Sequence, residues 1–112
     1  MYVLETKINT DSPEFSEQRQ AYQELMESHQ AKLRQALQGG SQKARDKHHE
    51  RGKLLARERI DLLVDPNTPF LELSSLAAYG MYNDSFPSAG VVSGIGIIHG
   101  REAIISANDA TV

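Results

Sequence analysis

Four cations lie close together near the middle of the sequence: Arg51, Lys53, Arg57 and Arg59. An arginine presents a planar fork of hydrogen-bond donors and a lysine presents a compact positive charge, and both side chains bind phosphate oxygens. The chemistry open to this cluster is therefore the binding of a small polyanion. The competing interpretation is a short amphipathic helix with a solvated basic face, on which Arg57 pairs weakly with Asp61 one turn along. The residue types by themselves leave both interpretations open.

This basic patch contrasts with the acidity of the whole chain. The 112 residues hold 12 Lys and Arg against 15 Asp and Glu, a net charge of −3. Residues 43–59 hold seven of the cations and three of the acids, a local charge of +4. An acidic chain argues against a general nucleic-acid-binding protein, which usually carries a basic domain. A local patch of this kind is compatible with a small anionic ligand.

Cysteine content and hydropathy exclude several classes of site and partner. The sequence has no cysteine, which excludes disulfides, thiolate catalysis and cysteine-based zinc sites within it. It contains no apolar run of the ~18–20 residues that a membrane span needs. Its N-terminus lacks the apolar core of a signal peptide and the Arg/Ser-rich character of a mitochondrial import signal. We therefore expect no membrane partner and a cytoplasmic location.

No other residue pattern indicates catalysis or metal binding. His48 and His49 are adjacent, so on a helix they point about 100° apart and are poorly placed to share one metal ion. Gly94, Gly96 and Gly100 have the wrong spacing for a dinucleotide-binding loop, and no helix follows them. We expect them to be strand glycines that let another backbone approach. The sequence thus predicts neither a catalytic residue nor a metal site.

Two helices are predicted in the first half of the chain. Ser12-Pro13 supplies an N-cap oxygen and a proline for the first helical position, and Gly39-Gly40 supplies a helix end. A second helix is predicted over residues 42–50, broken by Gly52. The first helix has an apolar stripe at helical spacing: Phe15, Tyr22, Leu25, Met26, His29, Leu33, Ala36 and Leu37.

A third, short helix is predicted over residues 55–64. It ends before Pro66 because proline disfavours helix at the residue that precedes it. Leu55 provides no side-chain oxygen to cap this helix, where a serine or threonine would form a capping box with Glu58. Its apolar face is expected to consist of three residues: Ile60, Leu63 and Val64.

After Pro66 the sequence favours strands. A short strand is predicted at residues 70–74. Residues 77–89 form a long connection, which we expect Met81 and Tyr82 to anchor in a pocket.

A β-hairpin is predicted next. Residues 90–98 and 101–107 are its two strands, and both are strongly apolar. His99-Gly100 is the two-residue turn between them, since glycine favours the backbone of a tight hairpin turn.

Four stretches of the sequence form a recognisable combination: residues 51–63, Asp65-Pro66, residues 69–74 and residues 107–112. Together they closely resemble the carboxyltransferase (beta) subunits of biotin-dependent acyl-CoA carboxylases, and among these the methylcrotonyl-CoA carboxylases. The resemblance extends over residues 10–112. It covers only the N-terminal part of such a subunit, so we expect the chain to be a fragment.

The resemblance implies an α/β fold, namely the N-terminal part of a crotonase-like carboxyltransferase domain (a superhelix of β-β-α turns) with leading helices and a β-hairpin. The implied organisation is an extended arm at residues 1–11, a charged helical segment at residues 12–65, and the incomplete start of the crotonase-like domain at residues 66–112. Family members transfer a carboxyl group from carboxybiotin to an acyl-CoA, whose enolate is stabilised by backbone N–H groups of glycine-rich loops. Those loops follow Val112 in the family, so the fragment alone is expected to be inactive.

The resemblance also implies ligands and partners. The expected acceptor is 3-methylcrotonyl-CoA, in leucine degradation, with geranyl-CoA as the other candidate. Biotin is expected on a partner alpha subunit, the beta subunits are expected to form a homo-oligomer, and no cofactor or nucleic acid is expected on the fragment. Lys53, Arg57 and Arg59 are the candidates for contact with the CoA phosphates. Their competing role, which the charge pattern favours, is to pair with acids at a helix or subunit interface. The alternative function is a non-enzymatic helical adaptor.

Overall fold

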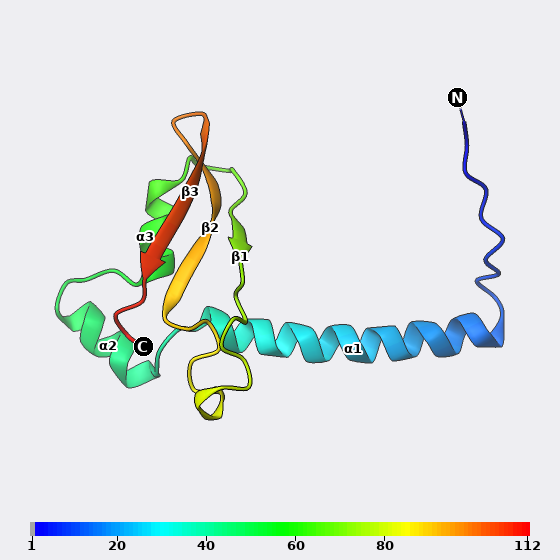
Figure 1. The fold of residues 1–112 in the computed structure, drawn as a ribbon, viewed down its shortest axis with the longest axis horizontal. Coiled ribbons are helices and arrows are strands. Elements are labelled where there is room, and N and C mark those ends of the chain that lie inside the picture. The colour runs from blue at the N-terminus through cyan, green and yellow to red at the C-terminus, as the bar shows by residue number, and fades with distance from the viewer. Residues whose placement is uncertain (1) are drawn as a thin grey trace. The chain divides into compact units, whose positions relative to one another are not determined.

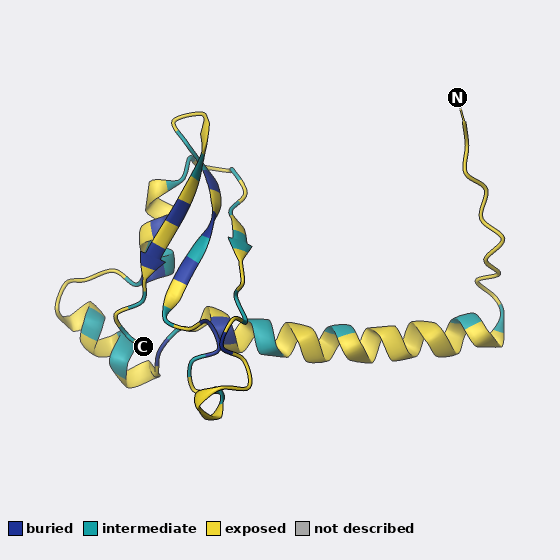
Figure 2. Ribbon diagram, in the orientation of Figure 1, coloured by how far each residue is buried: buried dark blue, intermediate teal, exposed yellow. Residues whose placement is uncertain are grey.

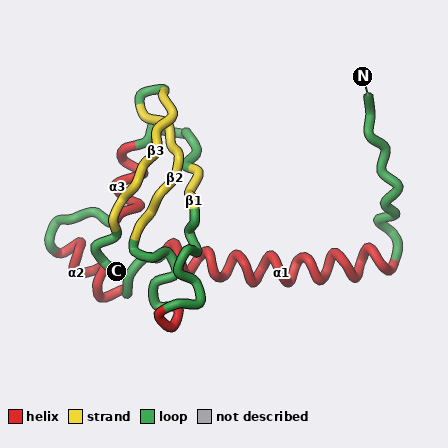
Figure 3. The backbone as a smooth tube through the Cα atoms, viewed as in Figure 1, coloured by secondary structure: helices red, strands yellow, loops and turns green. Residues whose placement is uncertain are grey.

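The computed structural model describes residues 2–112, so Met1 of the predicted arm lies outside the described residues. The described chain contains three α-helices, one short 3-10 helix and three strands (Figures 1 and 3). It divides into two compact units, one ending at Ala31 and one spanning Lys32–Val112. Helix α1, Pro13–Leu37, begins in the first unit and ends in the second.

The first unit holds an arm without regular structure and most of α1. Residues 2–9 form neither helix nor strand. Helix α1 begins as predicted, because Ser12 Oγ accepts the N–H of Phe15 at 3.2 Å and Pro13 occupies the first helical position, where no N–H is required. Tyr22 and Leu25 of the predicted apolar stripe are 62% and 65% exposed. Within this unit these two side chains are therefore uncovered.

The end of α1 and the start of α2 are held by a residue near the C-terminus. Gly39 takes a φ of +72°, which confirms the predicted helix end. The next residue, Gly40, is buried; its N–H donates to Thr111 Oγ1 at 3.0 Å, and a Cβ added to it would overlap the Thr111 carbonyl. Helix α2, Gln42–Glu50, then begins with Ser41 as its N-cap.

The second unit is built around an antiparallel sheet in the order β1-β2-β3. Strand β1 is Leu71–Leu73, β2 is Val91–Ile98 and β3 is Arg101–Asn108, which confirms the three predicted strands and places β1 beside the hairpin. Helix α3, Ala56–Leu63, packs against β2 and β3 (Figure 1). Between them lies the core of this unit (Figure 2): Ala56, Ile60, Val92, Ile105 and Ala107, with Val64, Phe70 and Ile98 around it.

The apolar face of α3 differs from the predicted one at one residue. Ile60 is 2% exposed and Val64 is half-buried, but Leu63 is 50% exposed. Ala56, at 5% exposure, takes its place. Residues 56, 60 and 64 follow one another at intervals of four, which gives a narrower stripe than the one predicted. The small alanine side chain lets the start of α3 lie close to the sheet.

Two glycines on the inner face of β2 make room for their neighbours. A Cβ added to Gly94 would overlap the carbonyl of Leu71 and the ring of Phe70. A Cβ added to Gly96 would lie 2.8 Å from Val64 Cγ1. The prediction that a backbone approaches the glycines is confirmed at Gly94, whereas the close neighbours of Gly96 are side chains. It is wrong for Gly100, which lies in the hairpin turn with open space where a Cβ would be.

The hairpin turn is the two-residue turn predicted. Ile98 pairs with Arg101, and His99 and Gly100 have φ values of +50° and +74°, as a type I′ turn requires. Asp65 supports the turn from outside, because its carboxylate accepts the N–H of His99 at 2.8 Å and the N–H of Gly100 at 2.7 Å. These bonds, the one from Gly100 first, lower the pKa of the Asp65 carboxyl.

We expect Asp65→Asn to flatten the acid limb of the stability profile. A carboxyl with a lowered pKa contributes its full stability above its ordinary value of 3.8, and that contribution is lost as the pH falls through the lower folded-state value. The free energy of unfolding of the native sequence should therefore fall more steeply below about pH 4 than that of Asp65→Asn. Urea denaturation across the acid range measures this difference, with Asp61→Asn as the control. Parallel profiles for the native sequence and Asp65→Asn would contradict the prediction.

The connection between β1 and β2 is anchored by small residues. Met81 and Tyr82 are 52% and 68% exposed, so the prediction that they fill a pocket is wrong. Ala78 and Ser88 are buried instead, at 3% and 4% exposure, and the Ala78 N–H donates to the Pro87 carbonyl at 2.9 Å. This backbone contact brings the two ends of the connection so close that only small side chains fit between them. The 3-10 helix, Tyr82–Asp84, forms the tip.

Candidate phosphate-binding groove

The structure gives Arg57 a different environment from the other two candidate cations. Its guanidinium is bound by the Glu72 carboxylate, with Nη1 donating to Oε2 and Nη2 donating to Oε1 at 2.8 Å. Its Nε donates to the Leu37 carbonyl at 3.1 Å. The side chains of Arg57 and Glu72 are only 25% and 15% exposed. Arg57 therefore links α3 to β1 and to the end of α1.

This contact overturns the predicted pairing of Arg57 with Asp61. An ion pair one turn apart on an exposed helix contributes only ~0.2–0.5 kcal/mol. A bidentate ion pair between an arginine and a carboxylate is stronger than such a helix pair, and its strength increases when it is partly shielded from water. Asp61 is near in the sequence, but folding brings Glu72, fifteen residues further along, to the guanidinium.

Lys53 and Arg59 lie together on one groove of the second unit, which we call the cationic groove. Its volume is about 530 Å³, and it is lined by eight residues: His48, Gly52, Lys53, Leu54, Ala56, Arg59, Asn108 and Ala110. A second groove of about 410 Å³ shares Leu54 and Arg59 with it. The other residues of this apolar groove are mostly apolar: Ile60, Leu62, Leu63, Ile105, Ser106 and Ala107. Arg59 therefore lies at the boundary between the cationic groove and the apolar groove.

Lys53 reaches the cationic groove from the loop of residues 51–55, between α2 and α3. Helix α2 ends in a Schellman motif: the Gly52 N–H donates to the His49 carbonyl at 2.8 Å, and the Lys53 N–H donates to the His48 carbonyl at 3.2 Å, the two bonds that define this motif. Gly52 has a φ of +70°, a conformation that glycine adopts most readily. The prediction that Gly52 breaks the second helix is confirmed.

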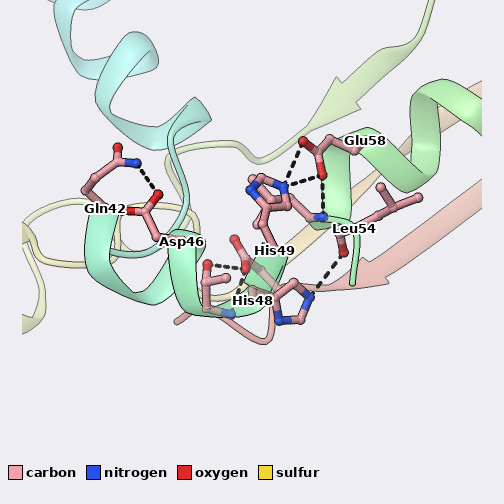
Figure 4. Close-up of polar contacts among 9 residues, drawn as sticks. Gln42, Asp46, His48, His49, Leu54 and Glu58 are labelled. Atoms are coloured by element: carbon pink, nitrogen blue, oxygen red, sulfur yellow. Dashed lines mark hydrogen bonds and ion pairs between the residues drawn. The ribbon is translucent and has the colours of Figure 1, made fainter. Parts of the chain in front are cut away.

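Two histidines and a glutamate hold this loop at two separate points (Figure 4). His48 Nε2 lies 3.1 Å from the Leu54 carbonyl oxygen. His49 Nε2 lies 3.0 Å and 2.9 Å from the two carboxylate oxygens of Glu58. A carbonyl and a carboxylate only accept hydrogen bonds, so each Nε2 carries the hydrogen. Glu58 Oε2 also accepts the N–H of Leu55 at 2.7 Å.

The expectation that Leu55 gives α3 no side-chain cap is confirmed, but Glu58 supplies the other half of a capping box. Leu55 has no side-chain oxygen, but Glu58, at the third position of the helix, reaches back to the Leu55 N–H. This bond is the second half of a capping box. The contact with His49, and after it the Leu55 N–H, lower the pKa of the Glu58 carboxyl. Glu58 is therefore an anion at neutral pH and is bound to the last residue of the loop that carries Lys53.

His48 and Asn108 belong to the groove and were missed by the sequence analysis. His48 precedes Lys53 by five residues, a separation that a Schellman motif closes, and Asn108 lies in the C-terminal stretch that carries the family resemblance. Among residues 2–112, no three His, Cys, Asp or Glu side chains are grouped to hold a metal ion. Over the same residues, no helix is both long enough and apolar enough to cross a membrane.

Comparison of the sequence with known proteins gives one family and a set of relatives. Residues 47–112 match the carboxyl transferase domain. The chain is 58% identical over 81 residues to the biotin-dependent 3-methylcrotonyl-coenzyme A carboxylase beta1 subunit of Mycobacterium tuberculosis, covering 72% of this chain and 15% of that protein. It is 44% identical over 111 residues to the probable mitochondrial methylcrotonoyl-CoA carboxylase beta chain of Drosophila melanogaster, covering 98% of this chain and 19% of that protein.

Solved structures show the same relationship. The beta subunit of geranyl-CoA carboxylase from P. aeruginosa superposes with a TM-score of 0.71 and 34% identity, over 97% of this chain and 20% of that one. Transcarboxylase 12S, described as a hexamer assembly with methylmalonyl-coenzyme A bound, superposes with a TM-score of 0.68 and 33% identity, over 78% of this chain and 18% of that one.

The chain spans no more than 20% of the length of these relatives. Within that span, helices followed by an antiparallel hairpin confirm the predicted α/β fold of a crotonase-like carboxyltransferase domain. Sequence and fold agree over most of the chain, and the chain is therefore a member of the carboxyl transferase domain family.

Proposed function

We propose that this chain is the N-terminal portion of the carboxyltransferase (beta) subunit of a biotin-dependent acyl-CoA carboxylase, and that Lys53 and Arg59 contact the phosphates of the acyl-CoA. The observation that carries the proposal is the cationic groove, in which both cations are exposed. Neither one makes an ion pair within residues 2–112. In this proposal residues 1–11 are an arm, residues 12–65 a helical segment and residues 66–112 the start of the crotonase-like domain.

The chemistry of the two grooves supports an acyl-CoA as the ligand. An acyl-CoA carries phosphates at one end and a largely apolar thioester at the other. Charged donors suit the phosphates, and the apolar groove beyond Arg59 offers a surface to the less polar part. Arg57 contributes only through the position of α3, because Glu72 and the Leu37 carbonyl already engage its donors.

We expect the double substitution Lys53→Ala with Arg59→Ala, in the complete subunit, to raise the KM for acyl-CoA while leaving kcat nearly unchanged. Two exposed charge-assisted contacts contribute about 1–2 kcal/mol of binding, which corresponds to an increase of about 5- to 30-fold. Steady-state carboxylation assays measure both constants. A loss of binding shared by ground state and transition state changes KM alone.

Lys43→Ala with Lys47→Ala is the matched control, because it removes the same charge from α2 at residues that do not line the cationic groove. Titration of the variants with CoA and with 3′-dephospho-CoA then identifies the phosphate involved. If the contact is to the 3′-phosphate, the difference between the two ligands disappears in the double variant. If it is to the diphosphate, both ligands bind more weakly. An unchanged KM and unchanged affinity for both ligands would overturn the proposal.

For the acceptor we propose 3-methylcrotonyl-CoA, in leucine degradation. The support is the similarity to two relatives whose names carry that substrate. Geranyl-CoA is the competing acceptor, supported by the similarity to the P. aeruginosa structure. The ratio of kcat/KM for the two acyl-CoAs, measured in one assay, decides between them.

Partners and location are further parts of this proposal. Carboxybiotin is expected on a partner alpha subunit, as the family resemblance implies, and no cofactor is assigned to this chain. Homo-oligomeric beta subunits are supported by the hexamer described for transcarboxylase 12S. No described residue is assigned a catalytic role, so we expect the isolated chain to be inactive. The expected location is cytoplasmic, and the competing one is mitochondrial, because the Drosophila relative is named as mitochondrial. Cell fractionation distinguishes the two.

One observation favours the alternative of a non-enzymatic adaptor. Leu71, Ile95 and Ile104 form a row across the outer face of the sheet, and they are 61%, 36% and 85% exposed. In an adaptor this face would bind a partner protein, whereas in a carboxyltransferase it would pack against further parts of the domain. The adaptor would be favoured by two results together. Ile104→Asp would abolish binding of a partner protein, and Lys53→Ala with Arg59→Ala would leave the KM for acyl-CoA unchanged.

A further inference from the structure

We propose that His48 and His49 are positioning residues for acyl-CoA binding, which hold the loop of residues 51–55 so that Lys53 stays in the cationic groove. The inference rests on the proposed function of Lys53 and Arg59. It adds the two residues that determine where one of these cations lies.

The backbone on both sides of Lys53 is held by His48. The Lys53 N–H donates to the His48 carbonyl at 3.2 Å, and the carbonyl of the next residue, Leu54, accepts from His48 Nε2 at 3.1 Å. One residue of α2 therefore binds the loop just before and just after the Lys53 side chain. The loop itself belongs to no helix or strand, so these contacts replace the regular hydrogen bonds that would otherwise order it.

His49 holds the other end of the same loop through Glu58. Its Nε2 binds both oxygens of the carboxylate, which orients that carboxylate to accept the Leu55 N–H. His48 and His49 point in different directions because they are adjacent on a helix. That divergence makes them poor ligands for one metal ion, but it lets them reach two separate points of one loop (Figure 4).

His49 is the more informative of the two residues to change. His48 lines the cationic groove, so its removal would also alter the groove wall, whereas His49 is absent from that lining. Without the His49 contact the loop gains conformational freedom, which ligand binding must then remove. The loss should therefore appear as weaker acyl-CoA binding and not as slower chemistry.

The test uses the complete subunit with its partner, in steady-state carboxylation assays. We expect His49→Ala to raise the KM for acyl-CoA about 3- to 10-fold with little change in kcat. His49→Gln, whose amide N–H also donates to a carboxylate, should restore most of the affinity. His29→Ala, at an exposed position of α1, is the control and should leave KM unchanged. In a Lys53→Ala background, His49→Ala should have almost no further effect, because it acts through Lys53.

The outcomes separate this inference from the proposed function. If Lys53→Ala and Arg59→Ala leave KM unchanged, the proposed function fails and the inference fails with it. If they raise KM but His49→Ala has no effect, only the inference is overturned. The same holds if His49→Ala raises KM equally in the native sequence and in the Lys53→Ala background. Limited trypsin digestion gives a readout that does not depend on activity. Cleavage after Arg51 and Lys53 should be faster in His49→Ala than in His29→Ala, and equal rates would overturn the inference.

Discussion

Gly94→Ala is expected to destabilise the protein by about 3 kcal/mol or more, whereas Gly96→Ala should cost only about 1 kcal/mol. Both glycines lie on the inner face of β2, two residues apart. The added methyl group at Gly94 would overlap the Leu71 carbonyl of β1 and the ring of Phe70. Relief of that overlap requires β1 to separate from β2. At Gly96 the neighbours are side-chain atoms, Val64 Cγ1 at 2.8 Å and Ile105 Cδ1 at 3.1 Å, which can shift by a few tenths of an ångström without separating the strands.

Urea denaturation followed by circular dichroism measures both losses, and amide hydrogen exchange shows where they act. In Gly94→Ala the amides of β1 and its neighbours in β2 should exchange faster. In Gly96→Ala they should keep nearly native protection. Equal losses in the two variants would contradict the prediction, which rests on the backbone oxygen that lies against Gly94 and not against Gly96.

Arg57→Ala is the second large effect expected, with a loss of about 2–3 kcal/mol. The substitution leaves the Glu72 carboxylate, which is 15% exposed, without its partner, and the Leu37 carbonyl loses a donor. Full burial of such a pair would give a loss of about 3–5 kcal/mol. The partial exposure of Arg57, at 25%, places our value below that range.

A double-mutant cycle tests whether the loss comes from the unpaired carboxylate. Arg57→Leu with Glu72→Leu should recover most of the stability, because no charge is left without a partner. The coupling energy from urea denaturation should be about 1–2 kcal/mol. Arg101→Ala, at an exposed residue of the hairpin, serves as the control with a change near zero. Additive losses in the cycle would show that Arg57 and Glu72 do not act as a pair.

Element boundaries were predicted well because their signals are local. Ser12 caps α1, Gly52 ends α2, and His99-Gly100 turns the hairpin, each through the backbone preference of the residue itself and its nearest neighbours. Such preferences act in the same way whatever the rest of the chain does. The helix and strand boundaries therefore agree with the structure to within one or two residues.

Contacts between distant residues were predicted poorly. Asp61 was the expected partner of Arg57, but Glu72 is the observed one. Leu63 was expected on the apolar face of α3, but Ala56 is the residue buried there. Met81 and Tyr82 were expected in a pocket that the folded connection does not form. In each case a local feature of the sequence, either a nearby opposite charge or a large apolar side chain, predicted the contact less well than the packing of the elements does.

The sequence by itself determined the three helices, the hairpin and the family, because local backbone preferences and shared motifs do not depend on long-range contacts. It also indicated Lys53, Arg57 and Arg59 as candidates for binding an anion. Only the tertiary structure decided that Lys53 and Arg59 share a groove while Arg57 is engaged by Glu72. The physical reason is that the partner of a charged side chain depends on how α3 packs against the sheet. That packing brings together residues between which no local pattern shows a connection.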